Sequence, residues 1–261
     1  MMRSLWTGAT GMVAQQLNID VISNNLANVN TTGFKKSRAE FEDLMYQTMR
    51  MAGAITEGDN RLPVGIQVGM GARPTAVHKF FTQGDFQNTG NTLDVAIEGD
   101  GFFQVDVNGE LMYTRAGSFK LNQDGTVVTA NGYILQPQFA VPAQTKTISI
   151  SSSGHMAALD AQGQELAGAE LPLYTFINPA GLDARGRNLY TPTEASGDAT
   201  EGVPGTDNVG TLAQGFLEMS NVEVVDEMVN MIVGQRAYEV NSKSIQTSDS
   251  MLGIAVQLKR S

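Results

Sequence analysis

The residues that could do chemistry in this chain are few and widely spaced. The 261-residue sequence contains no cysteine and only two histidines, His78 and His155. Thiolate nucleophiles, disulfides and thiolate metal sites are therefore excluded. We predict that His78 lies in a strand and His155 in a turn, neither with a catalytic partner.

Carboxylates are the remaining candidates for chemistry. Asp94, Glu98 and Asp100 occur close together, and a facing pair of carboxylates is what hydrolysis of a glycosidic bond requires. Asp106-Val107-Asn108-Gly109-Glu110 resembles a fragment of a calcium loop, but it lacks the later ligands and is better explained as a hairpin turn. No serine-, lysine- or histidine-based hydrolase motif is present. We predict no catalytic residue, cofactor or metal; an enzyme acting on cell-wall glycan remains an alternative if those three carboxylates face one another.

Charge is distributed unevenly along the chain, whose formal net charge is −10. Residues 1–34 carry one acid and one base, and residues 219–261 carry five acids and four bases. The middle of the chain therefore holds 21 acids and 12 bases. Such an acidic region disfavours nucleic acid, because binding depends on neutralising phosphates. The near-neutral ends, in contrast, can approach one another without a charge penalty, so we assign association to them.

The N-terminal stretch has a seven-residue apolar repeat. Its members are Leu5, Met12, Ile19, Ile22, Leu26 and Val29. Such a repeat keeps one stripe of a helix against a partner, as in a coiled coil. We predict a helix from about Ser4 to Asn28 that depends on packing for its stability, because Gly8, Gly11 and several asparagines have low helix propensity. The alternative is a helix packed on the core of its own domain.

The C-terminal stretch also has apolar residues at seven-residue intervals. Its apolar members are Val229, Met231, Ile232, Tyr238, Ile245 and Leu252. Ser220 or Asn221 is predicted to cap a helix that continues to about Leu258, with Glu223 in the capping-box position relative to Ser220. A helix of this length needs a partner along most of its course, and the shorter N-terminal helix covers only part of it. Other subunits are expected to cover the rest.

Between the two ends, short apolar runs alternate with turns. Asn108-Gly109, Asp124-Gly125 and Asn131-Gly132 are turn dipeptides set between such runs, which predicts repeated hairpins. We expect strands over residues 94–97, 102–107, 111–114, 118–121, 126–129, 133–136, 147–150, 156–159, 170–177, 189–191 and 212–219, with a surface loop over 194–211. The predicted fold class is α+β, with terminal helices paired as a coiled coil and a central, mostly antiparallel β domain resembling a sandwich or barrel.

Residues 35–70 have a less regular pattern. Phe41, Leu44, Met45 and Met49 could form a short amphipathic helix, and residues 51–63 form a looped or extended insertion. Alternation over residues 62–68 favours a hairpin that becomes ordered in an assembly over a flexible linker. The predicted domains are 1–34, an N-terminal helix; 35–70, a connecting segment; 71–219, the β-rich domain; and 220–261, a C-terminal helix.

Two sequence motifs resemble those of the bacterial flagellar rod and hook proteins. The first comprises Asn24, Asn25, Leu26, Ala27, Asn28, Thr32, Gly33 and Phe34, and the second comprises Gln235, Arg236, Ala237, Tyr238 and Asn241. Residues 41–47, 99–105 and 113–115 and the overall length also resemble this family, and within it the distal part of the rod. An insertion containing Tyr46, Gly53, Gly58, Pro63 and Gly65 is what, by resemblance, separates a stiff distal rod from a bendable hook. One departure is Gly234, where the family more often has a larger residue.

The resemblance implies a structural protein rather than an enzyme. Its implied partners are copies of itself in a helical tube, other rod proteins, the hook, the surrounding basal-body rings and the type III export apparatus, with no nucleic acid and no small-molecule substrate. It implies a position in the basal body, spanning the periplasm toward the outer membrane, and export without a cleaved signal peptide. A proximal rod or hook-type protein is the alternative within the family, and a β-rich fibre or adhesin with a coiled-coil stalk is the alternative outside it.

Overall fold

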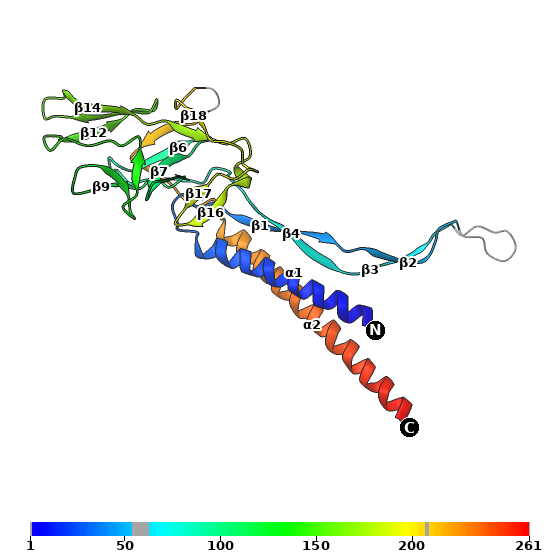
Figure 1. The fold of residues 1–261 in the computed structure, drawn as a ribbon. Coiled ribbons are helices and arrows are strands. Elements are labelled where there is room, and N and C mark those ends of the chain that lie inside the picture. Colours follow the sequence, from blue (N-terminus) through cyan, green and yellow to red (C-terminus); the bar gives the residue numbers. More distant parts are fainter. Residues whose placement is uncertain (1, 54–62, 207–208, 261) are drawn as a thin grey trace. The chain divides into compact units, whose positions relative to one another are not determined.

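The computed structural model describes residues 2–53, 63–206 and 209–260, which form two compact units (Figure 1). The first, called here the helical unit, comprises Met1–Leu26, Ser37–His78 and Glu223–Ser261. The second, called here the β unit, comprises Ala27–Lys36 and Lys79–Val222. Each unit therefore combines segments that are separated in the sequence.

The helical unit contains the two helices predicted at the ends of the chain. They are α1 (Met2–Ala27) and α2 (Val224–Arg260), about 39 Å and 55 Å long at 1.5 Å per residue. Capping of α2 by Ser220 or Asn221 is wrong. The Asn221 side chain is occupied elsewhere, accepting from the Lys36 backbone N–H at 2.7 Å and donating to the Phe80 carbonyl at 3.0 Å, so α2 begins only at Val224.

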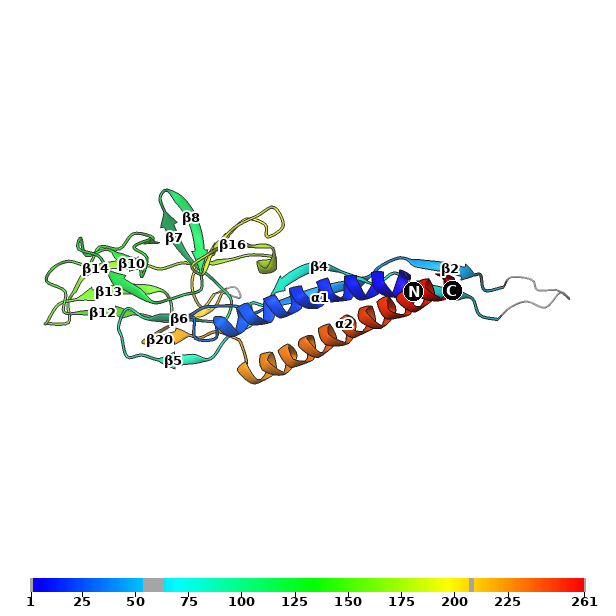
Figure 2. The same cartoon turned by 90° about the horizontal axis from the view of Figure 1, so that it is seen from below.

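The two helices pack against each other in opposite directions. The Ser4 and Ser248 hydroxyls are 2.9 Å apart near one end, and Asn25 Nδ2 lies 3.4 Å from Glu227 Oε2 near the other. Figures 1 and 2 show α1 and α2 side by side, with both chain termini at the same end of the pair. Because Ser4 lies opposite Ser248 and α1 begins at Met2, the last turns of α2 extend beyond α1.

Four strands complete the helical unit. They are β1 (Ser37–Asp43), β2 (Tyr46–Arg50), β3 (Ile66–Gly69) and β4 (Ala72–Lys79). β1 pairs with β4, and β2 pairs antiparallel with β3, with Tyr46 opposite Gly69. The amphipathic helix suggested around Phe41 to Met49 is wrong, because this backbone forms its hydrogen bonds with the later strands β3 and β4. The hairpin expected over residues 62–68 is present in its described part.

The β unit is a series of short strands. They are β5 (Phe86–Asn88), β6 (Val95–Glu98), β7 (Phe103–Val107), β8 (Glu110–Thr114), β9 (Phe119–Leu121), β10 (Val127–Thr129), β11 (Ile134–Gln136), β12 (Thr147–Ile150), β13 (His155–Leu159), β14 (Glu165–Glu170), β15 (Leu173–Thr175), β16 (Asp183–Gly186), β17 (Leu189–Thr191), β18 (Thr200–Gly202), β19 (Thr211–Gln214) and β20 (Phe216–Glu218). A short 3₁₀ helix covers Pro179–Gly181.

The strands of the β unit pair antiparallel in several small sheets. One sheet has seven strands in the order β16-β17-β8-β7-β11-β10-β9, and another has three in the order β12-β13-β14. β15 pairs with β18, β19 with β6 and β20 with β5. The described strands form no closed barrel, because the seven-stranded sheet ends at the short strands β16 and β9, which do not pair with each other. The barrel-like form of the prediction is therefore wrong.

The core of the β unit explains why these strands form. Phe103, Val105, Leu135, Met156 and Leu173 are fully buried in one apolar cluster that joins several sheets. Apolar runs set between turn dipeptides located most of these strands correctly. Several details differ: the run over 170–177 is divided between β14 and β15, the run over 212–219 is divided between β19 and β20, and His155 begins a strand instead of occupying a turn. The surface loop expected over 194–211 contains the short strand β18.

Candidate assembly surface

The inner face of the helix pair is built mostly from small and polar residues. Along α2, one stripe of buried or half-buried positions is spaced by three, four or seven residues: Glu227, Met231, Gly234, Asn241, Ile245, Ser248 and Leu252. The residues of α1 whose contacts with this stripe are defined include Ser4, Gly8, Gly11 and Asn25.

Glycines allow this close approach of the two helices. A Cβ added to Gly8 would lie 2.9 Å from Ile245 Cγ1, and one added to Gly11 would lie 2.9 Å from Asn241 Nδ2. A Cβ added to Gly234 would lie 3.2 Å from Ile19 Cγ1. The departure from the family pattern at Gly234 therefore lies in the contact between α1 and α2, facing Ile19.

The apolar residues predicted to form the helix seam differ in how deeply they are buried. On α1, Ile22 is buried, and Leu5, Met12, Ile19 and Leu26 are half-buried, as is Val29 beyond the end of the helix. On α2, half of the predicted set is half-buried and half is exposed. The half-buried members are Met231, Ile245 and Leu252, and the exposed members are Val229, Ile232 and Tyr238. A substantial part of the apolar surface of the helices therefore faces outward in a single chain.

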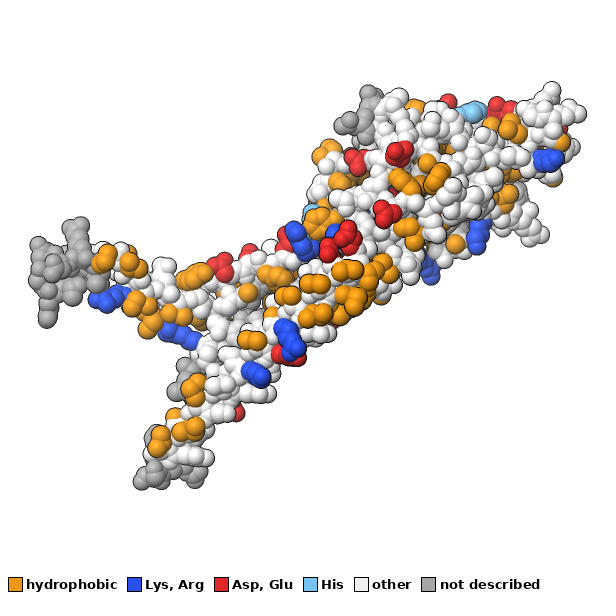
Figure 3. All heavy atoms as spheres, turned by 180° about the vertical axis from the view of Figure 1, so that it is seen from behind, with side chains coloured by type: hydrophobic (Ala, Val, Ile, Leu, Met, Phe, Trp, Pro, Cys, Tyr) orange, Lys and Arg blue, Asp and Glu red, His pale blue; other side chains and the backbone are white. Residues whose placement is uncertain are grey.

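The exposed apolar residues of α2 form a continuous patch over its first turns, called here the α2 patch. Its members are Val224, Val225, Met228, Val229, Ile232 and Val233, which are 40–73% exposed. Figure 3 shows these hydrophobic side chains gathered along the start of α2. Single exposed apolar residues are ordinary on a protein surface, but a contiguous patch of this kind marks an interaction site.

The outer face of α1 forms an apolar groove, called here the α1 groove. It is lined by Trp6, Ala9, Thr10, Val13, Leu44, Ala72, Arg73 and Pro74 and has a volume of about 270 Å³. Trp6 and Val13 are each 60% exposed. The far wall comes close to the helix at Gly71, where φ is +116° and an added Cβ would collide with Thr10 Oγ1.

The N-terminal motif organises the turn after α1. Asn25 is buried and pairs with Ser37 as a strand would: its Nδ2 donates to the Ser37 carbonyl at 2.7 Å, and its Oδ1 accepts from the Ser37 N–H at 2.9 Å. Asn28 Oδ1 accepts from the Thr31 hydroxyl at 3.2 Å. Through these bonds the two asparagine side chains close the end of the helix and its turn. Asn24 and Ala27 are exposed, and Leu26 is half-buried.

The end of this motif lies in the β unit. The Thr32 carbonyl accepts from Asn188 at 2.8 Å, and the Gly33 N–H donates to the Glu218 carbonyl at 2.8 Å. Gly33 has φ of +68°, and an added Cβ would lie 2.7 Å from the Ala116 nitrogen. Phe34 is buried, with the Lys79 ammonium 5.7 Å from the centre of its ring.

The C-terminal motif is mostly exposed. Gln235, Arg236 and Tyr238 are exposed, and Arg236 Nη1 donates to Glu239 at 2.8 Å on the surface of α2. Ala237 is half-buried, and Asn241 is the residue packed on Gly11. Only Asn241 of this motif therefore has a defined contact within the helix pair.

A buried charge cluster in the β unit was missed at the level of sequence. Lys35 Nζ donates to Glu218 Oε1 at 2.6 Å and to the Thr82 carbonyl at 2.7 Å, while Arg115 Nε donates to Glu218 Oε2 at 2.7 Å. All three charged side chains are at most 4% exposed. Because Lys35 and Glu218 are 183 residues apart, no local pattern could have found the pair.

The charges of this cluster depend on one another. Burial alone would raise the pKa of Glu218, but the charges of Arg115 and Lys35 and the hydrogen bonds they donate hold it below its usual value of 4.5. Burial lowers the pKa of Lys35 below its usual 10.5, although the Glu218 carboxylate opposes that shift. Glu218 is therefore the anion that makes the burial of two bases tolerable.

The residues of the predicted insertion lie on the ribbon formed by β2 and β3 and beyond it. Tyr46 is 55% exposed at the start of β2, and Gly53 and Pro63 are exposed at the two edges of the described part. A Cβ added to Gly65 would lie 2.7 Å from the Arg50 carbonyl oxygen, so glycine permits the strands to pair closely there. Gly58 lies outside the described residues.

The three carboxylates considered for hydrolysis differ in burial. Asp94 is buried, and its carboxylate accepts from the Thr89 hydroxyl at 2.6 Å and from Asn91 at 3.1 Å, which closes a turn. Glu98 and Asp100 are exposed. The Asp94 carboxylate is thus already engaged by its neighbours.

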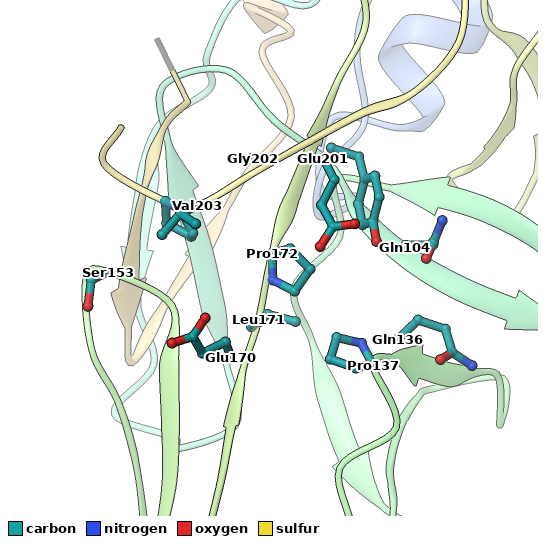
Figure 4. A pocket seen from close by; sticks show the side chains of 12 residues that line it. Gln104, Gln136, Pro137, Ser153, Glu170, Leu171, Pro172, Glu201, Gly202 and Val203 are labelled. Carbon is teal, nitrogen blue, oxygen red and sulfur yellow. The ribbon is translucent and has the colours of Figure 1, made fainter. Parts of the chain in front are cut away.

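A different pair of carboxylates borders a cavity of about 470 Å³ in the β unit (Figure 4). Glu170 and Glu201 line it together with Gln104, Tyr174 and several prolines. Burial and the nearby Glu201 raise the pKa of Tyr174, so its hydroxyl stays protonated. The lining residues include no lysine, arginine, histidine or cysteine.

Within the described part of the chain, neither helix is long and apolar enough to cross a membrane.

Three family models match the chain. They are described as "Flagella basal body rod protein" (residues 5–35), "Flagellar hook protein FlgE/F/G D1 domain" (residues 96–158) and "Flagellar basal body rod FlgEFG protein C-terminal" (residues 213–258). The matches cover α1 and its motif, much of the β unit, and nearly all of α2.

Relatives of similar length are named flagellar basal-body rod protein FlgG. The protein of Borreliella burgdorferi is 50% identical over 100% of both chains, and that of Caulobacter vibrioides is 46% identical over 99% of this chain and 100% of its own. The protein of Bacillus subtilis is 43% identical over 100% of both chains. The similarity thus extends from end to end.

Proposed function

The chain belongs to the FlgG family of flagellar basal-body rod proteins and is a structural subunit of the rod, and on this premise we propose that it self-assembles in the rod's distal part. The observation that carries the proposal is the division of surfaces in the helical unit. The contact between α1 and α2 combines glycine, serine and asparagine with Ile19 and Ile245, while the valines, methionine and isoleucine of the α2 patch and Trp6 face outward.

Assembly would bury these outward faces. Full burial of a valine-, methionine- or isoleucine-sized side chain contributes roughly 1.5–3 kcal/mol, and the half-exposed members of the α2 patch would each gain a fraction of that. Several such residues per neighbour, repeated along a helical array, make a stiff tube that transmits torque. In that tube the seven-residue repeats of α1 and α2 would run as coiled-coil seams.

The remaining parts would have supporting roles. The domain boundaries at residues 34, 70 and 219 would separate the helices that line the tube, the stiffening insertion and the acidic β domain. Other rod proteins and the hook would contact the assembly at its ends, and the basal-body rings would surround it. The chain would reach the periplasm through the type III apparatus without a cleaved signal.

Polymerisation of the purified chain tests the proposal. Val229→Glu places a charge in the α2 patch, and Ile177→Glu, at a position 91% exposed in the β unit, is the matched control. We expect the wild-type and Ile177→Glu chains to form filaments that sediment and are visible by electron microscopy, and Val229→Glu to remain monomeric with unchanged helix content. Filaments of Val229→Glu at the wild-type concentration would contradict the proposal.

A further inference from the structure

The α1 groove and the α2 patch lie on opposite faces of the helix pair. On α2, Val225, Val229 and Ile232 lie two residues before Glu227, Met231 and Gly234, which belong to the inner stripe. Two residues correspond to about 200° of rotation around the helix, so the patch lies on the side of α2 opposite the stripe. On α1, Trp6 and Val13 each follow by two residues Ser4 and Gly11, which contact α2. One chain therefore presents a hollow in one direction and an apolar ridge in the other.

We propose that the α2 patch of one copy inserts into the α1 groove of the next copy. This inference rests on the self-assembly proposed above and names the two surfaces that meet. A groove on one face and a ridge on the other make a head-to-tail contact, which leaves a free groove and a free ridge on every pair. Such a contact adds copies indefinitely instead of closing a dimer.

The volume and lining of the groove suit such a ridge. An apolar cavity of about 150 Å³ already takes a benzene molecule, so the 270 Å³ of the groove accommodates more than one aliphatic side chain. Trp6 and Val13 on one wall and Leu44, Ala72 and Pro74 on the other offer apolar contact to Val225, Met228 and Ile232.

Charges beside the two surfaces are complementary. The exposed acids Glu223 and Asp226 flank the start of the α2 patch, and no ion pair within the described ranges involves either of them. Arg73 lies in the groove, where it pairs with Glu42, and Arg3 lies one turn before Trp6. Docking would bring these acids toward the arginines, so opposite charges surround an apolar centre.

Charge also disfavours the other exposed apolar stretch of α2 as the occupant of the groove. Met251, Ile254, Val256 and Leu258 are exposed near the end of the helix. The sequence continues with two bases, Lys259 and Arg260, so this stretch carries positive charge, as the groove does at Arg73. Like charges at a contact are costly, so we assign the groove to the start of α2.

Directed disulfide formation tests the pairing, because the chain has no cysteine of its own. Val13→Cys chains are mixed with Met228→Cys chains, polymerised and oxidised with copper phenanthroline, and the linked peptides are identified by mass spectrometry. The matched control mixes Val13→Cys with Ile254→Cys, since the three positions are 51–60% exposed. Sedimentation before oxidation reports whether the mixed chains polymerise.

We expect the 13–228 link to form in the polymer at least tenfold more than the 13–254 link or any link within a single variant. A dominant 13–13 link would indicate a symmetric dimer, and a dominant 13–254 link would assign the groove to the other end of α2; either result overturns the inference. Polymer without a 13–228 link refutes this pairing and leaves the proposed function intact. Chains that do not polymerise refute both.

Discussion

The contact between the two helices can be tested through its glycines. In an exposed helix, glycine to alanine stabilises the helix by roughly 0.5–1 kcal/mol, because alanine has the higher helix propensity. At Gly253, nothing lies within 4 Å of an added Cβ, so Gly253→Ala should show that gain alone. At Gly8, the same change places a methyl group 2.9 Å from Ile245 Cγ1.

The expected cost at Gly8 follows from this distance. Ile245 is β-branched and has little freedom to rotate away, and overpacking of this kind costs about 1–3 kcal/mol. After the propensity gain is subtracted, Gly8→Ala should destabilise the helical unit by up to about 2 kcal/mol. For a chain of this size, each kcal/mol lowers the melting temperature by about 2–4 °C.

Thermal unfolding of the monomer, followed by circular dichroism at 222 nm, measures the difference. Gly8→Ala should melt below wild type, and Gly253→Ala should melt at or above it. In a double-mutant cycle, adding Ile245→Ala should remove most of the penalty at Gly8, with a coupling of about 0.5–3 kcal/mol. If Gly8→Ala stabilises the chain as much as Gly253→Ala does, and shows no coupling to Ile245, the helices are not packed at this position and our account of the seam is incorrect.

Three further predictions concern the β unit. Glu218→Gln leaves two buried bases without their anion and should lower the free energy of unfolding in urea by about 3–5 kcal/mol. The control Glu40→Gln removes an exposed ion pair and should change that free energy by less than about 1 kcal/mol. The pKa of Glu218 is lower in the folded chain than its usual value of 4.5. The stability that the charged carboxylate contributes is therefore fully present above pH 4.5 and is lost as the pH falls through the lower folded pKa. Urea midpoints of wild type should therefore converge on those of Glu218→Gln in acid, and a gap that stays constant with pH would refute this assignment. Gly33→Ala should destabilise more than Gly132→Ala, since both have positive φ but only the first collides with Ala116, and equal urea midpoints would contradict that.

The sequence predicted the elements of this protein better than their contacts. Heptad spacing located both helices, and turn dipeptides located most strands of the β unit, because both signals are local. The contact between the helices was harder to predict. Apolar repeats suggested that residues such as Tyr238 and Ile232 face the partner helix, whereas the close approach uses Gly8, Gly11 and Gly234.

Long-range contacts explain the other errors. The backbone around Phe41 to Met49 is extended because β3 and β4 provide its hydrogen bonds, and a nine-residue window holds no sign of them. The Lys35–Glu218–Arg115 cluster joins three distant segments, so its only local signal was the presence of Lys35 directly after the N-terminal motif. The outward apolar faces became visible only once the inner stripe of each helix was known.

The central claim is that polymerisation buries the outer faces of both helices, and fluorescence of Trp6 tests it most directly. Trp6 is the single tryptophan of the chain and is 60% exposed in the α1 groove. We predict that, when filaments form, its emission shifts to shorter wavelength and acrylamide quenching falls severalfold. Filaments in which Trp6 keeps the emission maximum and quenching of the monomer would contradict the claim.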